Sequence, residues 1–261
     1  MMSPFLHTAL EAARTAQEII LHYYHGSFDI ELKPDQSPVT IADLEAEQAI
    51  KNLILARFPE HGFFGEETGK TNPDAEYTWL IDPIDGTKSF VRRYPMFSTQ
   101  IALMQGSELI LGVSNAPAFG ELAYAERGQG AFLNNQPLKV SGYTELKQAA
   151  LSLGNIASLA ASPQWTALGQ IIPQVQRIRG YGDFLHYHLL ASGKLEIVIE
   201  SDVNILDVAA LSVIVQEAGG VLTDLNGQTL NLASTSILAA ASPELHQQVL
   251  QHLHYQWINA S

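Results

Sequence analysis

Residues 82–87, Asp-Pro-Ile-Asp-Gly-Thr, place two carboxylates around a proline directly after the apolar run 79–81. We expect a buried strand to stop here at a polar site, because Pro83 has no N–H for a continuing ladder. Asp82 and Asp85 then lie close together, which is costly unless a cation lies between them. Carboxylates suit a hard ion such as magnesium, and the free N–H groups of a following helix suit a phosphate. The segment therefore predicts a metal-dependent site for a phosphorylated substrate.

Two acidic residues earlier in the chain could join this site. Glu66 follows the short apolar strand expected at 62–65, so it is either a further metal ligand or part of a solvated acidic turn. Asp43 lies three residues after Thr40 at an expected helix start, a spacing close to that of a capping box. Asp43 either only caps this helix or also accepts a hydrogen bond from a hydroxyl, supplied by Thr87, that orients a water molecule.

Three acidic residues of the second half also lie at the ends of expected elements. Asp207 is in the first turn of an apolar helix, where the helix dipole alone favours an acid. Asp183 follows Gly182 at another helix start and could be an N-cap. Glu200 comes at the end of an apolar strand.

The whole chain has the composition of an ordinary globular protein. It has 261 residues, of which 46% are hydrophobic and 16% charged, enough for a large core. Its net charge of −13 argues against nucleic acid as a partner, and the absence of cysteine excludes disulfides and thiolate-ligated metals. The longest apolar runs fall short of the ~20 residues that span a bilayer, and the N-terminus has no signal-peptide pattern. We expect a cytoplasmic protein without a membrane segment.

Hydrophobic periodicity divides the chain into two halves, residues 1–145 and 146–261. Helices are expected at 4–25 and 40–58, with Leu44, Ile50 and Ile54 on the apolar face of the second, followed by a meandering sheet from 61 to 140. Strands and helices alternate in the second half, with helices near 163–172, 183–192, 205–218 and 243–256. We expect the site to lie where the halves meet.

Three elements, in this order and at these separations, resemble the inositol monophosphatase family of magnesium-dependent phosphatases. They are Gly65-Glu66-Glu67, the segment 82–87 with Phe90, and Asp207-Val208-Ala209-Ala210. The likeness extends over nearly the whole chain. The family usually has tryptophan before the third aspartate, where this chain has Leu206. We expect that difference to alter local packing rather than metal binding.

The resemblance implies the fold, the cofactor and the roles of the acidic residues. The fold would be of the α+β/α/β type, a layered α-β-α-β-α sandwich of the inositol monophosphatase and fructose-1,6-bisphosphatase type, commonly a homodimer. Two to three Mg²⁺ ions are implied. Glu66, Asp82 and the carbonyl of Ile84 would hold one ion, and Asp82, Asp85 and Asp207 a second. Glu66 would also contact a weaker third ion. The first half, 1–145, would thus carry most metal ligands, and the second half, 146–261, the last metal ligand and the substrate-recognition residues.

The resemblance further implies catalytic and substrate-binding residues. Thr87 and Asp43 would orient the attacking water, with Glu66 as a further catalytic residue, and the amides of Gly86 and Thr87 would hold the phosphate. The full set of implied substrate-binding residues is Asp85, Gly86, Thr87, Asp183, Glu200 and Asp207.

The substrate depends on the segment Tyr181-Gly182-Asp183-Phe184, with Tyr187, which resembles the histidinol-phosphatase subgroup. Histidinol phosphate carries an ammonium and an imidazole, and an extra carboxylate near aromatic rings suits such a cation. We therefore expect hydrolysis of histidinol phosphate, a step of histidine biosynthesis. The alternatives are an inositol-1-phosphate phosphatase, a 3′,5′-nucleotide bisphosphatase, or a protein-binding regulatory relative with residual phosphatase activity.

Overall fold

The computed structural model describes residues 2–26, 30–32 and 38–258. The chain forms two compact units, one of Met1–Gln136 with Leu206–Ile214 and the other of Pro137–Ile205 with Val215–Ser261. These units differ from two continuous halves divided at residue 145. The segment that carries Asp207 follows the second half's first strands in sequence, yet it packs with the first unit. Among the described residues, no helix is long and apolar enough to span a bilayer.

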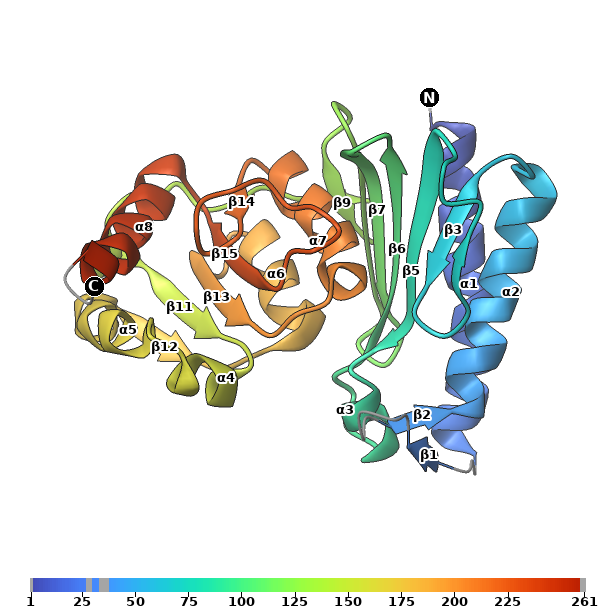
Figure 1. The fold of residues 1–261 in the computed structure, drawn as a ribbon, viewed down its shortest axis with the longest axis horizontal. Helices are drawn as coiled ribbons and strands as arrows, with labels where there is room; N and C mark the ends of the chain where they lie inside the picture. The colour runs from blue at the N-terminus through green and yellow to red at the C-terminus, as the bar shows by residue number, and fades with distance from the viewer. Residues whose placement is uncertain (1, 27–29, 33–37, 259–261) are drawn as a thin grey trace. The chain divides into compact units, whose positions relative to one another are not determined.

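An eight-stranded sheet forms the centre of the first unit, with the strand order β10-β9-β8-β7-β6-β5-β3-β4 (Figure 1). Strands β5 to β9 pair antiparallel with their neighbours, whereas β3 and β5 are parallel. This confirms the meandering sheet expected from the sequence. The strands are β3 Gly62–Gly65, β4 Gly69–Thr71, β5 Tyr77–Asp85, β6 Ser98–Gln105, β7 Glu108–Ala116, β8 Glu121–Glu126, β9 Ala131–Leu133 and β10 Gln136–Pro137. A separate antiparallel pair consists of β1 (Ile30–Leu32) and β2 (Pro38–Thr40).

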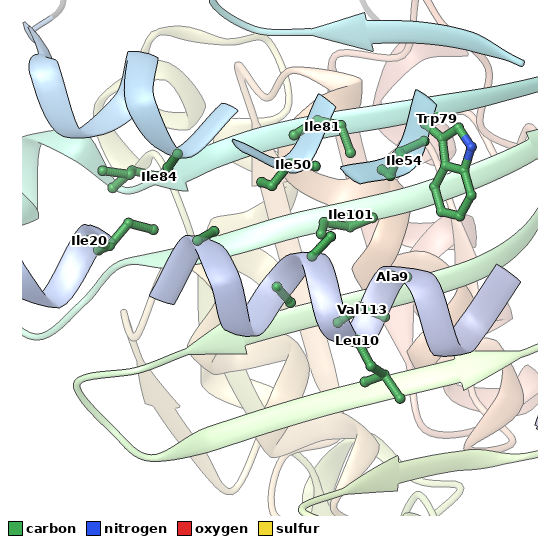
Figure 2. Close-up of a cluster of buried hydrophobic side chains, with 14 of the residues drawn as sticks. Ala9, Leu10, Ile20, Ile50, Ile54, Trp79, Ile81, Ile84, Ile101 and Val113 are labelled. Atoms are coloured by element: carbon green, nitrogen blue, oxygen red, sulfur yellow. The ribbon is translucent and has the colours of Figure 1, made fainter. Parts of the chain in front are cut away.

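Two long helices cover one face of this sheet, α1 (Pro4–His25) and α2 (Ile41–Arg57), as the sequence predicts. Helix α1 begins at a proline, and the Ser3 hydroxyl caps it by accepting the N–H of Leu6. Figure 2 shows Ile20 of α1 and Ile50 and Ile54 of α2 pointing toward the strands, where they form one buried cluster with Trp79. This core fixes both helices against the sheet.

The buried face of α2 differs from the one expected. Leu44 is 44% exposed, so its assignment to the apolar face was wrong. The neighbouring Asp43 and Glu47 are buried instead, one helical turn apart. The reason is that both carboxylates accept hydrogen bonds from other polar groups of this unit. Such bonds compensate the cost of burying a charge.

Strand β5 continues through Pro83 to Asp85, so the expected stop at the proline was also wrong. The ladder with β6 pairs Asp82 with Gln100, shifts its register, and resumes with Asp85 opposite Ser98. The register has to shift here because Pro83 has no N–H to donate to the ladder. The Pro83 carbonyl accepts a hydrogen bond from the Thr99 hydroxyl at 2.9 Å, which holds the irregular stretch in place.

The second unit is built on a five-stranded mixed sheet with the order β12-β11-β13-β15-β14. Its strands are β11 Ala150–Leu153, β12 Arg177–Arg179, β13 Ile197–Ser201, β14 Val221–Thr223 and β15 Ser236–Ala240. Its helices are α5 Trp165–Ile171, α6 Asp183–Ala191 and α8 Pro243–Ile258, close to the predicted ranges, with the additional short α4 Ile156–Ala161. Helix α7 (Ile205–Glu217) is also at its predicted place, and its residues 206–214 belong to the first unit.

Candidate metal centre and its relatives

Three carboxylates of the first unit meet at the end of β5. Asp82 and Asp85 lie on the irregular stretch of that strand, and Asp207 comes from the first turn of α7. One carboxylate oxygen of each lies within 4.8 Å of the other two. The structure thus brings together residues that are more than 120 positions apart in the sequence.

Glu66 adds a fourth carboxylate to this group. It directly follows β3, and its N–H donates to the Ile81 carbonyl at 3.1 Å, which ties it to β5. The pKa of the buried Asp82 lies well above its ordinary value, first because burial disfavours its charge. The charges of Glu66, Asp207 and Asp85, and a hydrogen bond with Glu66, raise it further. Asp82 is therefore the centre of a concentration of negative charge.

The donors of this cluster fit a divalent cation. All of them are carboxylate oxygens, the ligands that magnesium and calcium prefer, and their mutual repulsion is what a cation would remove. The backbone adds a rigid element, because the Ile84 N–H donates to Asp82 Oδ1 at 2.9 Å and fixes that side chain. The inositol monophosphatase resemblance also assigns the Ile84 carbonyl to a metal. This carbonyl accepts the Thr87 hydroxyl at 2.9 Å, and its second lone pair permits a further ligand bond.

Asp43 caps α2 and also lies within hydrogen-bond distance of the Thr87 hydroxyl. Its Oδ2 accepts the N–H and the hydroxyl of Thr40 at 2.8 and 2.6 Å, and the Thr40 hydroxyl in turn accepts the Ala42 N–H. This is a complete capping box at the start of α2. Its Oδ1 faces the Thr87 hydroxyl at 3.4 Å. A helix cap thus holds one carboxylate oxygen in place while the other faces the first residue of α3 (Thr87–Val91), which begins directly after Gly86.

The second unit contains another group of polar side chains around Glu200, the buried acid near the end of β13. Glu200 Oε2 accepts the Tyr187 hydroxyl at 2.9 Å and lies 3.2 Å from His186 Nε2. The other ring nitrogen of His186 lies 3.3 Å from the Ser152 hydroxyl. Burial first, and then the charge of Glu200, raises the pKa of Asp183 to about 6, while His186 acts in the opposite direction.

Asp183 does not cap α6. The helix begins at Asp183 itself, Gly182 is in the N-cap position, and no side-chain capping bond is formed there. Asp183 also has a positive φ of 47°, a conformation that aspartate tolerates better than most residues. The N-cap interpretation of Asp183 is therefore wrong, and its carboxylate belongs to the Glu200 group.

Sequence reasoning missed two participants. His186 was not among the expected site residues, yet its spacing of three from Asp183 on a helix is a signal that both share one face. Glu47 was missed because the apolar pattern of α2 was extended across it. Its spacing of four from Asp43 is the corresponding signal.

Comparison with known proteins agrees with this geometry. A profile of the inositol monophosphatase family matches residues 1–257. A histidinol-phosphatase of Chlorobaculum parvum is 37% identical over 92% of this chain and 93% of its own length. Inositol monophosphatase 1 of Solanum lycopersicum is 33% identical over 97% of this chain and 95% of its own.

A solved structure confirms the fold. The extragenic suppressor protein suhB from Bartonella henselae superimposes with a TM-score of 0.88 at 28% identity, covering 96% of this chain and 98% of that one. The fold class expected from the sequence, a layered α-β-α-β-α sandwich, is thereby confirmed. With a family profile that matches nearly its full length, the chain belongs to the inositol monophosphatase family and is a phosphatase that acts on phosphoric monoesters.

Proposed function

We propose that this chain is a magnesium-dependent phosphatase that hydrolyses histidinol phosphate to histidinol and phosphate. The metal dependence is supported by one observation. Carboxylate oxygens of Asp82, Asp85 and Asp207 lie within 4.8 Å of one another, and Glu66 forms a hydrogen bond with Asp82. Glu66, Asp82 and the Ile84 carbonyl would hold one Mg²⁺, Asp82, Asp85 and Asp207 a second, and Glu66 would contact a third. When bound, these ions would activate water and stabilise the developing negative charge.

The chain's own residues would orient the reactants. The Thr87 hydroxyl lies 2.9 Å from the Ile84 carbonyl and 3.4 Å from Asp43 Oδ1, and its one hydrogen can be donated to either. When Asp43 accepts it, the hydroxyl oxygen can accept a hydrogen bond from a water molecule and align that water for attack. We propose that the amides of Gly86 and Thr87 hold the phosphate at the start of α3. Asp85 and Asp207 would be both metal ligands and substrate-binding residues. Asp82 would have the central role, since it alone would contact both principal ions through its side chain.

The Asp183–Glu200 pair supports histidinol phosphate as the substrate. These two carboxylates are close enough for the charge of Glu200 to raise the pKa of Asp183. A cationic alcohol group would relieve this repulsion, whereas the hydroxyls of an inositol ring would not. The 37% identity to a histidinol-phosphatase supports the same choice. Inositol 1-phosphate is the second candidate, supported by the 33% identity to an inositol monophosphatase.

A phosphate-release panel tests this proposal. Histidinol phosphate, inositol 1-phosphate and 3′-phosphoadenosine 5′-phosphate are compared at equal Mg²⁺, with and without EDTA. We expect histidinol phosphate to have the highest kcat/KM, EDTA to abolish activity and added Mg²⁺ to restore it. Asp183→Asn should lower kcat/KM for histidinol phosphate by about ten- to a hundred-fold, the loss of one charge-assisted contact, and leave inositol 1-phosphate unaffected. Equal rates on both substrates before and after the change would favour inositol 1-phosphate.

We also propose a place in histidine biosynthesis, a cytoplasmic location and a homodimer. The first follows from the proposed substrate, and the other two follow from the family resemblance. Light scattering on the purified chain, which gives its mass in solution against 28.5 kDa for one copy, tests the homodimer.

A further inference from the structure

Glu47 is a fully buried glutamate in the middle of α2. Its carboxylate spans two consecutive peptide N–H groups of the turn after β3. Oε2 accepts the N–H of Glu67 at 2.8 Å, and Oε1 accepts the N–H of Thr68 at 2.7 Å. Such short, charge-assisted bonds to a buried acceptor hold a turn firmly.

The strand before the turn is shaped around this carboxylate. A Cβ added to Gly65 would lie 2.4 Å from Glu47 Cδ, far inside contact distance. Glycine therefore allows the backbone of β3 to pass directly against the carboxylate. This close approach is independent of the two hydrogen bonds, and it shows the same carboxylate fitted to the same segment of chain.

The residue between these contacts is Glu66. Its own N–H is fixed on Ile81 of β5, Gly65 before it packs on Glu47, and Glu67 after it donates to Glu47. The backbone of Glu66 is thus held from both sides, with its carboxylate at Asp82. Helix α2 supplies this support one turn after Asp43, which meets Thr87, so one helix contacts the chain beside Glu66 and at Thr87.

We propose that Glu47 is a positioning residue for the metal centre, which acts by fixing the Gly65–Thr68 turn so that Glu66 meets Asp82. This inference rests on the proposed metal-dependent function. A purely structural buried glutamate would lower stability when it is changed, without altering the affinity of the protein for a metal.

Glu47→Gln tests the proposal, because glutamine keeps the shape and one acceptor oxygen but turns an NH₂ donor toward the second N–H. Glu196→Gln is the matched control. Glu196 is also a buried glutamate that accepts a backbone N–H, that of Ala150 at 2.7 Å, but it lies in the second unit. For both variants and the wild type, Mg²⁺ affinity is measured by calorimetry, thermal stability by circular dichroism, and amide exchange by mass spectrometry without metal.

We expect both variants to lose thermal stability, and only Glu47→Gln to bind Mg²⁺ more weakly, by about ten-fold or more, as is usual for groups that orient metal ligands. The amides of residues 66–68 should exchange faster in that variant alone. In a Glu66→Gln background, adding Glu47→Gln should have no further effect on Mg²⁺ affinity, because the two act in series. If Glu47→Gln does not fold, Gly65→Ala is measured in its place, because the added Cβ would displace the same carboxylate. We expect the same loss of Mg²⁺ affinity in that variant.

Unchanged Mg²⁺ affinity in Glu47→Gln, with the wild type binding normally, would overturn this inference and leave the proposed function intact. A wild type that neither binds nor requires Mg²⁺ would instead overturn the proposed function. An additional loss of affinity in the Glu66→Gln background would show that Glu47 acts through another group and would also reject the proposal.

Discussion

Gly112 of β7 lies directly against the backbone of Ala210 in α7. A Cβ added to Gly112 would be 2.2 Å from the Ala210 carbonyl oxygen. The neighbours Leu111 and Val113 belong to the core shared with α1 and α2, so alternation along the strand turns Gly112 to the opposite face of the sheet. Because Gly112 has no side chain, α7 can approach the sheet closely at this point. Asp207 lies one helical turn before Ala210, so this contact helps to set its position.

This contact predicts that Gly112→Ala moves Asp207 away from its partners. The added methyl group cannot fit without a shift of α7, which should lower stability by about 1–3 kcal/mol as in other overpacked cores. The displacement should also raise the Mg²⁺ concentration needed for half-maximal activity. Gly169→Ala in α5, where an added Cβ meets nothing within 4 Å, is the control. A stability loss without any change in Mg²⁺ dependence would show that Asp207 does not depend on this contact.

Asp82→Asn should separate stability from function. The substitution removes one charge from the cluster with Glu66, Asp85 and Asp207, while the amide oxygen can still accept the Ile84 N–H. We expect the metal-free variant to melt at a higher temperature than the metal-free wild type, because the repulsion is reduced. Activity should fall about 10³-fold or more, the equivalent of several kcal/mol of lost transition-state stabilisation. Melting curves with and without Mg²⁺ check the stability, and phosphate release checks the activity. Near-normal turnover would place the metal centre elsewhere.

Thr87→Ala should lower kcat and leave KM nearly unchanged, because the hydroxyl would act on the water molecule and not on the substrate. The expected loss is about 10²–10⁴-fold, the usual range for assisted proton transfer. Thr87→Ser retains the hydroxyl that meets Asp43 Oδ1 and the Ile84 carbonyl, so it should recover most of the rate. Steady-state kinetics of both variants suffices. A higher KM with intact kcat in Thr87→Ala would exclude the water-orienting role.

Much of the fold could be predicted from the sequence because local periodicity determined it. The helices at 4–25 and 40–58 repeat apolar residues at helical spacing, and caps at Ser3 and Thr40 define where they begin. The short antiparallel strands were separated by recognisable turns. Two expectations in the first unit were wrong, the buried Leu44 and the strand that stops at Pro83. Hydrogen bonds between distant segments occur at both places, from Glu67 and Thr68 to Glu47 and from Thr99 to Pro83, and local patterns do not contain them.

The structure adds contacts at the candidate site that residue patterns do not contain. Residue types and strand-end positions indicated the carboxylates, but only the structure shows that Asp207 packs with the first unit. The spacing of Glu47 from Asp43 and of His186 from Asp183 indicates a shared helix face, but it does not indicate which groups Glu47 and His186 contact. A buried carboxylate on Glu67 and Thr68, and an imidazole between Ser152 and Glu200, are features of packing and not of spacing.

The last prediction concerns stability and pH at Asp183. Its pKa is raised from the ordinary 3.8 to about 6, so the folded protein holds this proton more tightly than the unfolded chain does. The proton on Asp183 therefore stabilises the folded state. This stabilisation is fully present below about pH 4 and is lost as the pH rises through about 6. At pH 7 the ionised carboxylate therefore destabilises the fold, by at most about 3 kcal/mol at 1.36 kcal/mol per pH unit.

Asp183→Asn should remove this effect, because asparagine is neutral and also tolerates the positive φ of 47°. Relative to the wild type, the variant should be more stable at pH 7, and this advantage should shrink and vanish as the pH falls to about 4. Asp202→Asn, the same change at an exposed residue with a φ of 59°, controls for the substitution and its backbone. Urea unfolding at several pH values between 4 and 7.5 measures the difference. A constant offset across this range would mean that Asp183 ionises freely beside Glu200, and the carboxylate pair would lose its reason to prefer a cationic substrate.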